Sequence, residues 1–185
     1  MIIVGLFCVV AVGGLVWSGQ KFGSSASTLL QIQMNTMKTI TLTSSAFLDN
    51  TLMPARFTCD GENTIPPFEI SNIPTQAKSL ALVLHDPDAQ APGGWTHWVK
   101  FNISTETTQI EEGKEPEGFS GEGGGGSLVY QGPCPPSGTH RYIFTIYALD
   151  KVLTLSEGAT ETELKEAMAT HILGEGTLTG LYKKI

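Results

Sequence analysis

Two short segments of the chain concentrate the residue types that could bind a charged ligand or transfer a proton. Residues 85–103, HDPDAQAPGGWTHWVKFNI, hold two aspartates, two histidines and two tryptophans around a Pro/Gly-rich turn, in a chain with only four histidines. Residues 132–142, GPCPPSGTHRY, place a further histidine and a tyrosine after a stiff loop. Imidazole and carboxylate groups serve as metal ligands, as acid–base catalysts or as partners of a charged ligand. Which of these chemistries applies depends on the elements that position the side chains.

Three predicted β-strands carry these segments. Residues 79–86 form a nearly continuous apolar run of strand length, which is typical of a buried central strand. Residues 95–103 predict a second strand, and strict alternation places four side chains on one of its faces: Trp95, His97, Val99 and Phe101. Residues 140–150 are rich in β-branched and aromatic residues and predict a third strand. One face of this strand holds His140, Tyr142, Phe144 and Ile146.

The polar side chains stand where these strands meet Pro/Gly loops, which is where pockets form on β scaffolds. Asp86 and Asp88 flank a proline, and a spacing of two residues in an extended chain points both carboxylates the same way. His97 lies near the start of the second strand, and His140 opens the third. His85 falls on the opposite strand face from Asp86 and is therefore left out of the predicted site.

Four interpretations of these polar residues stay open. The first is purely structural: the aspartates cap turns, and the histidines satisfy buried hydrogen bonds. The second is a metal site, although no pair has the His-x-x-x-His or Cys-x-x-Cys spacing typical of one. The third is catalysis by an Asp–His pair, which would need a nucleophile, and Cys134, Ser137 and Thr139 are candidates only by their nearness in sequence. The fourth is a pocket for a small anionic or zwitterionic group, held by the histidines and by loop N–H groups. The fourth uses every residue of the set and needs neither a metal nor a nucleophile.

The composition indicates one globular, β-rich domain. A length of 185 residues suffices for a single domain with a sizeable core, and 21 glycines and 10 prolines indicate many turns. The formal net charge of −7 argues against nucleic-acid binding, which needs a basic face. One clear helix is predicted near the C-terminus. It begins at Thr160 in a capping box with Glu163 and ends at Gly174.

The first 36 residues are predicted to lie outside this domain. Residues 2–17 form an unbroken apolar run, somewhat shorter than the about 20 residues that span a bilayer, and they are followed by a polar stretch. This pattern predicts a signal peptide or a signal anchor, and hence an exported protein or a membrane tether, although no Lys or Arg precedes the run. A true start at Met37 would instead predict a cytoplasmic protein. Cys59 and Cys134 could form a disulfide if the domain is exported, and the sequence does not decide whether they do.

The segments DPDAQAPGGWTHWVKFNI and GPCPPSGTHRYIFTIYALD closely resemble the two signature blocks of the phosphatidylethanolamine-binding protein family. The likeness runs from about Met37 to Lys184 and is greatest to the bacterial and archaeal branch, often described as Raf-kinase-inhibitor-like. It implies an all-β fold for residues 37–185, an antiparallel β-sandwich of a large and a small sheet with peripheral helices. It also implies a pocket that accepts phosphate, acetate, cacodylate or a phosphoethanolamine head group.

The resemblance assigns ligand binding to eight residues by their position in the motifs: Asp86, Asp88, Trp95, His97, Gly132, Pro133, His140 and Tyr142. It predicts a non-enzymatic protein that binds a small anion or a phospholipid head group. No cofactor, metal ligand or catalytic residue is expected. A hydrolase-like use of the Asp/His pocket is the alternative, and regulation of a kinase or a protease is the partner role known in the family. Two features depart from the family pattern and both border the pocket. Gln90 stands where proline is usual, and Gly123 to Gly126 enlarge the loop between the blocks.

Overall fold

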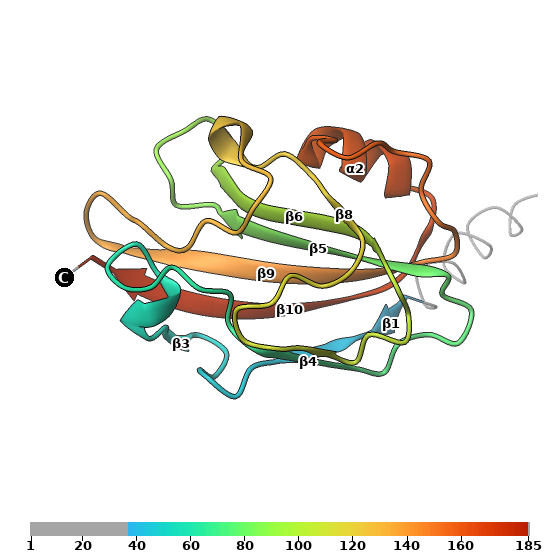
Figure 1. The fold of residues 1–185 in the computed structure, drawn as a ribbon, viewed down its shortest axis with the longest axis horizontal. Coiled ribbons are helices and arrows are strands. Elements are labelled where there is room, and N and C mark those ends of the chain that lie inside the picture. Colours follow the sequence, from blue (N-terminus) through green and yellow to red (C-terminus); the bar gives the residue numbers. More distant parts are fainter. Residues whose placement is uncertain (1–36, 185) are drawn as a thin grey trace, which may run out of the picture. The chain divides into compact units, whose positions relative to one another are not determined.

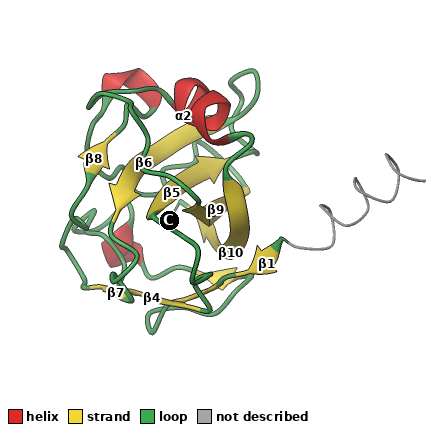
Figure 2. Ribbon diagram, turned by 90° about the vertical axis from the view of Figure 1, so that its right-hand side faces the viewer, coloured by secondary structure: helices red, strands yellow, loops and turns green. Residues whose placement is uncertain are grey.

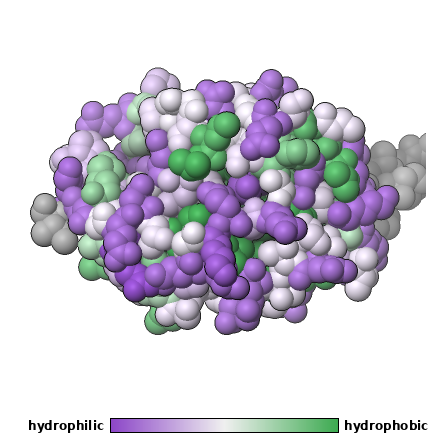
Figure 3. Space-filling model, viewed as in Figure 1, coloured by the Kyte–Doolittle hydropathy of each residue, from purple (hydrophilic) through white to green (hydrophobic). Residues whose placement is uncertain are grey.

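The structure, a computed structural model, describes residues 37–184 of the chain. Two β-sheets pack face to face in this part (Figures 1 and 2). The predicted leader in residues 1–36 lies outside the described residues. Within residues 37–184 no helix is long and apolar enough to cross a membrane. The face of the domain shown in Figure 3 is mainly hydrophilic, with hydrophobic side chains in small groups between polar ones.

The large sheet contains seven strands in the order β1, β10, β9, β5, β6 and β8, with β3 pairing to a further part of β10. The bounds of these strands are β1 Lys38–Thr39, β3 Thr51–Leu52, β5 Ser79–Asp86, β6 Trp95–Ile103, β8 Phe119–Ser120, β9 Thr139–Leu149 and β10 Ile172–Lys183. The small sheet has the order β2 (Thr41–Thr43), β4 (Phe68–Ser71) and β7 (Gln109–Ile110). All pairings are antiparallel except those of β1 and β3 with β10. The predicted all-β sandwich is confirmed.

Strand β5 is central and buried on both faces, as its continuous apolar run predicts. Leu80, Leu82 and Leu84 point into the core between the two sheets, where they pack with Phe144 and other aromatic residues of β9 and β4. Ala81 and Val83 point to the other side, into a second apolar cluster beneath the helix α2. Burying a Leu or Val side chain contributes about 1.5–3 kcal/mol. The sheet that holds the polar strand ends is therefore fixed from both sides.

The helix α2 (Glu161–Met168) covers the outer face of the large sheet (Figure 2). Its capping box between Thr160 and Glu163 forms as the sequence predicts. The predicted end of the helix at Gly174 is wrong, because residues from Ile172 onward join β10 and pair with β9. Two short 3₁₀ helices, Ala55–Phe57 and Gly124–Gly126, lie in the loops.

A β-bulge in β6 changes which side chains lie on each face of this strand. Leu84 of β5 pairs with Trp98 and the next residue, His85, pairs with Thr96, so His97 is an extra residue opposite this step. Trp98 consequently joins the core between the sheets, whereas Val99 and Phe101 join the cluster beneath α2. The expectation that Trp95, His97, Val99 and Phe101 share one face is therefore wrong beyond His97. The predicted face of β9, with Tyr142, Phe144 and Ile146 in the core between the sheets, is confirmed.

A close backbone approach at Gly176 gives a test of this arrangement. A Cβ atom at this buried position of β10 would collide with the carbonyl oxygen of Ile40, where the chain passes from β1 to β2. We expect Gly176→Ala to lower the free energy of unfolding by about 1–3 kcal/mol, as measured by urea denaturation. Thr177→Ala is the matched control, because Thr177 is exposed. This substitution should lower the free energy of unfolding by less than about 1 kcal/mol. Equal stability of the two variants would contradict the close approach.

Candidate ligand-binding site

A cavity of about 430 Å³ opens at the ends of β5, β6 and β9. Six of the eight residues predicted to bind a ligand line it: Asp86, Trp95, His97, Gly132, His140 and Tyr142. The first comes from the end of β5, the next two from the start of β6, and the last two from the start of β9. Strand pairing therefore brings together residues that lie about fifty positions apart in the chain, such as Asp86 and His140.

Asp86 and His140 form a buried pair at one side of the cavity. The Nδ1–H of His140 donates to Oδ2 of Asp86 over 2.8 Å, and Oδ1 of Asp86 accepts the backbone N–H of Asp88, also over 2.8 Å. The two residues are 7% and 2% exposed, so this carboxylate is shielded from water and both its oxygens are bonded inside the protein. The pair leaves Nε2 as the ring atom of His140 that a ligand can contact.

His97 faces the same cavity from the bulge in β6. Its Nδ1 lies 2.9 Å from the carbonyl oxygen of Gln131, and because a carbonyl can only accept, Nδ1 must carry the proton. Burial lowers the pKa of His97, which favours the neutral ring. The ring packs edge-on against Tyr142, with 5.2 Å between the ring centroids. Nε2 of this histidine is thus also left for a ligand.

The hydroxyl of Tyr142 is a further polar atom of the cavity. Tyr142 is fully buried, and its oxygen makes no hydrogen bond of ordinary geometry with the described residues. Burial, reinforced by the nearby charge of Asp86, raises the pKa of Tyr142, so the group stays a neutral O–H donor. Two imidazole nitrogens and one phenol therefore converge on a single small cavity.

Comparison with known proteins identifies the family of the chain. A family model described as phosphatidylethanolamine-binding protein matches residues 43–183. A UPF0098 protein of Methanothermobacter thermautotrophicus is 50% identical over 149 residues, which cover 77% of this chain and 98% of that protein. The chain belongs to the phosphatidylethanolamine-binding protein family.

Two crystal structures share the fold. CT736 of Chlamydia trachomatis, described as a proposed homologue of phosphatidylethanolamine-binding protein, superposes with a TM-score of 0.77 at 38% identity, over 80% of this chain and 99% of that one. YbcL of E. coli, described as a new member of the mammalian family, superposes with a TM-score of 0.74 at 24% identity, over 80% of this chain and 100% of that one. At that identity the second likeness concerns the fold alone.

Two of the predicted residues do not line the cavity of this family member. Asp88 turns outward and binds Arg141, with Nη2–Oδ1 and Nε–Oδ2 distances of 2.7 and 2.9 Å, and these bonds lower its pKa to about 2. Its expected alignment with Asp86 is wrong, because β5 ends at Asp86 and the two-residue repeat does not continue through the following turn. Pro133 is buried, and its carbonyl accepts the N–H of Cys59 over 3.0 Å.

The cavity wall also holds residues outside the eight that were predicted to bind a ligand. Asn63, Gln90 and Gln131 line it, as do Cys59 and Cys134. Asn63 has a positive φ of 56°, and its Oδ1 accepts the N–H of Gly132 over 2.8 Å. Gln90 is the residue that departs from the family pattern, and this departure was the one available signal that it borders the pocket. Among the described residues no group of three or more His, Cys, Asp or Glu side chains is arranged to hold a metal ion.

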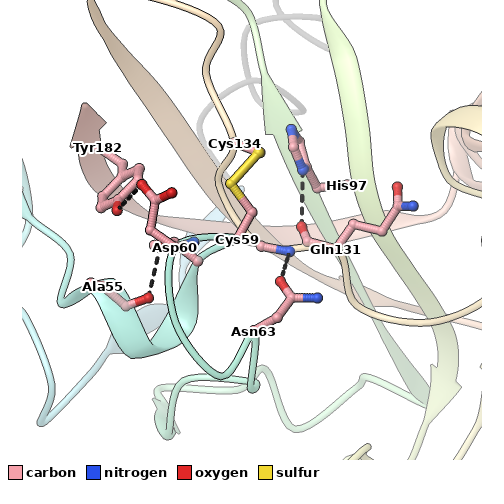
Figure 4. Close-up of a disulfide and its surroundings, with 10 residues drawn as sticks. Ala55, Cys59, Asp60, Asn63, His97, Gln131, Cys134 and Tyr182 are labelled. Atoms are coloured by element: carbon pink, nitrogen blue, oxygen red, sulfur yellow. Dashed lines mark hydrogen bonds between the residues drawn. A yellow bond between two sulfur atoms is a disulfide. The ribbon is translucent and has the colours of Figure 1, made fainter. Parts of the chain in front are cut away.

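A disulfide joins the two loops that form this wall. Cys59 and Cys134 are bonded, with 5.4 Å between their Cα atoms and 75 residues between them in sequence. Figure 4 shows the bridge beside His97 and Gln131, close to Asn63. Both cysteines are exposed to solvent. The bridge therefore stabilises the loop whose Gln131 carbonyl holds the ring of His97, and it is accessible to a reductant.

The contribution of this bridge can be measured. Because it closes a long loop, we expect dithiothreitol to lower the free energy of unfolding of the oxidised protein by roughly 2–4 kcal/mol in urea denaturation. A variant with Cys59→Ala and Cys134→Ala should show the same loss without reductant and should not respond to dithiothreitol. An equal response of the variant, or none in the unaltered protein, would contradict this role of the disulfide.

Proposed function

We propose that the protein binds a small anionic ligand, of the phosphate or phosphoethanolamine class, without turning it over. The observation that carries this proposal is the convergence of His140, His97 and Tyr142 on one cavity, where Nε2 of both rings makes no hydrogen bond to a described residue and the Tyr142 hydroxyl, near Asp86 and the Cys134 backbone, makes none of ordinary geometry. A phosphate-like group would complete these hydrogen bonds. Asp86 keeps its negative charge, and the N–H groups of Asp88 and His140 that bond its two oxygens partly offset the repulsion of an anion.

The absence of a lysine or arginine side chain among the residues that line the described cavity bears on the kind of anion. A cavity lined by two imidazoles, a phenol and amide groups offers little net positive charge. It suits a compact group of low charge whose oxygen atoms are individually hydrogen-bonded. This supports a small head group rather than a polyphosphate.

Hydrolysis is the second candidate, because Asp86 and His140 have the geometry of an orienting carboxylate and a base. The residues that were candidate nucleophiles do not support it. Cys134 forms the disulfide with Cys59 and has no free thiol. Ser137 and Thr139 are exposed and do not line the cavity. Tyr142 does line the cavity, but its raised pKa makes it a poor nucleophile at neutral pH.

The same proposal includes export or membrane tethering of the protein and a role in regulating another protein. A solvent-exposed disulfide supports an oxidising compartment, and with it export or membrane tethering through residues 2–17. In such a compartment the domain would present its head-group pocket to phospholipid or to a soluble ligand. Regulation of a kinase or a protease rests on the family resemblance, and a pull-down that survives mutation of the pocket would favour it.

Two aspartates separated by one residue provide a matched pair of variants. Asp86→Asn removes the negative charge behind His140 with little change of shape, and we expect it to weaken binding of phosphate and of O-phosphoethanolamine at least about tenfold. Asp88→Asn changes a residue that faces Arg141 outside the cavity, and its affinity should equal that of the unaltered protein. Isothermal titration calorimetry measures both.

The same titrations can contradict the proposal. Equal losses in the two variants, or no loss in Asp86→Asn, would show that the ligand does not use the Asp86–His140 pair. Turnover of a phosphoester or acyl-ester library that disappears in His140→Ala would replace binding by hydrolysis.

A further inference from the structure

The ring of Trp95 carries an inference about which part of a ligand it binds, and this inference rests on the proposed function. Trp95 is paired with Asp86 across β5 and β6, so its side chain stands on the sheet beside the Asp86–His140 pair. It lines the cavity and is 39% exposed, so it lies between the buried histidines and solvent. A substituent on an anion that is bound at the histidines would therefore pass this ring.

A glycine packs against one face of this ring. The 3₁₀ turn Gly124–Gly126 contacts the start of β6 (Figure 1). A Cβ atom added at Gly124 would overlap Cε2 of Trp95 most closely, and next the two atoms bonded to Cε2, which are Cζ2 and Nε1. A point beyond the ring edge would lie nearer to one of these two atoms than to Cε2, so Gly124 lies over a face of the indole. The opposite face is left for a ligand.

The ring, and not the backbone, requires a glycine at position 124. Gly124 has no positive φ, whereas Gly125 and Gly126 have φ values of 71° and 81°, which favour glycine. A backbone hydrogen bond of 3.2 Å from Gly126 to Gly123 closes the turn. The glycine run that departs from the family pattern therefore forms a defined surface that positions Trp95.

The size and charge of the cavity indicate what the free face of Trp95 would meet. A volume of about 430 Å³ falls in the range of pockets that enclose drug-sized ligands, roughly 300–1,000 Å³, so a phosphate group leaves room for a substituent. No lysine or arginine side chain lines the described cavity, whereas the carboxylate of Asp86 does. A positively charged substituent would therefore meet no basic side chain there, and the face of an indole attracts such a group.

We propose that Trp95 determines which substituent the cavity prefers: its free face binds an ammonium group attached to the phosphate that the two histidines and Tyr142 hold. The preferred ligands are then zwitterionic phosphate esters, such as O-phosphoethanolamine and phosphocholine. Anions without an ammonium group, such as phosphate and acetate, still bind at the histidines, with lower affinity. Gly124 is a positioning residue, since it keeps the ring in place without touching the ligand.

Phosphocholine and its carbon isostere, in which a tert-butyl group replaces the trimethylammonium group, separate the charge of the substituent from its shape. Calorimetric titration of the full chain at one pH and ionic strength should give an affinity for phosphocholine roughly three- to thirtyfold higher than for the isostere. Equal affinities, or tighter binding of the isostere, would overturn the inference.

Removal of the ring separates Trp95 from the nearby charge of Asp86. In Trp95→Leu the side chain stays apolar but has no aromatic face, so the ratio of the two affinities should fall to about one. A ratio that is kept in Trp95→Leu would assign the preference to the charge of Asp86 and would overturn the role of Trp95.

Two neighbouring glycines provide a matched pair of variants. Gly124→Ala forces the indole ring to move, so the preference for phosphocholine over the isostere should fall toward one. Gly125→Ala strains the same turn at a positive φ, but the nearest atom of Trp95 lies 4.0 Å from the added Cβ, so the preference should be kept. A preference that is lost in both variants, or in neither, would contradict the positioning role of Gly124.

A measurement on the unaltered protein keeps the inference testable if a variant does not fold. Nuclear Overhauser effects should connect the methyl protons of bound phosphocholine to the indole protons of Trp95, and effects to other residues alone would overturn the inference. Failure to bind phosphate, O-phosphoethanolamine and phosphocholine alike would overturn the proposed function itself. Binding of all three with no preference for phosphocholine over its isostere would overturn only the role of Trp95.

Discussion

A buried carboxylate has to be bonded on both oxygens, and this requirement at Asp86 determines how the rest of the site is arranged. Asp86 ends the central strand β5, so strands on either side shield it from water. One oxygen takes the N–H of the following turn and the other takes Nδ1–H of His140. The ring of His140 is thereby fixed with its second nitrogen left for a ligand. Removal of either partner would leave an uncompensated polar group in the core.

The second half of the site depends on loops rather than on the sheet. His97 is placed by a β-bulge and oriented by the backbone of Gln131. That backbone is held to the loop after the first 3₁₀ helix by the Cys59–Cys134 disulfide and by the bond from Gly132 to Asn63. The two histidines are therefore supported in different ways, His140 by a buried ionic partner and His97 by a covalently closed loop.

Much of this arrangement could be predicted from the sequence, because it follows from periodicity and from short motifs. The apolar run of β5 and the alternation of β9 correctly placed Asp86 and His140 at strand ends, and the family motifs supplied the sandwich. The bulge at His97 could not be predicted, since one extra residue leaves no mark in the hydrophobic pattern. Asp88 was placed wrongly because a turn, unlike a strand, does not repeat every two residues. Asn63 and the disulfide depend on contacts between segments far apart in the chain, which no local pattern records.

A crystal structure of the full chain grown with phosphate would show whether His97, His140 and Tyr142 together bind one phosphate-like anion. We expect a single anion in the cavity, with separate oxygen atoms within hydrogen-bonding distance of Nε2 of His97, Nε2 of His140 and the hydroxyl of Tyr142. The hydrogen bonds from His97 to Gln131 and from His140 to Asp86 should be unchanged. An anion bound elsewhere on the domain with this cavity left to water, or a His97 ring turned away from Gln131, would contradict the account.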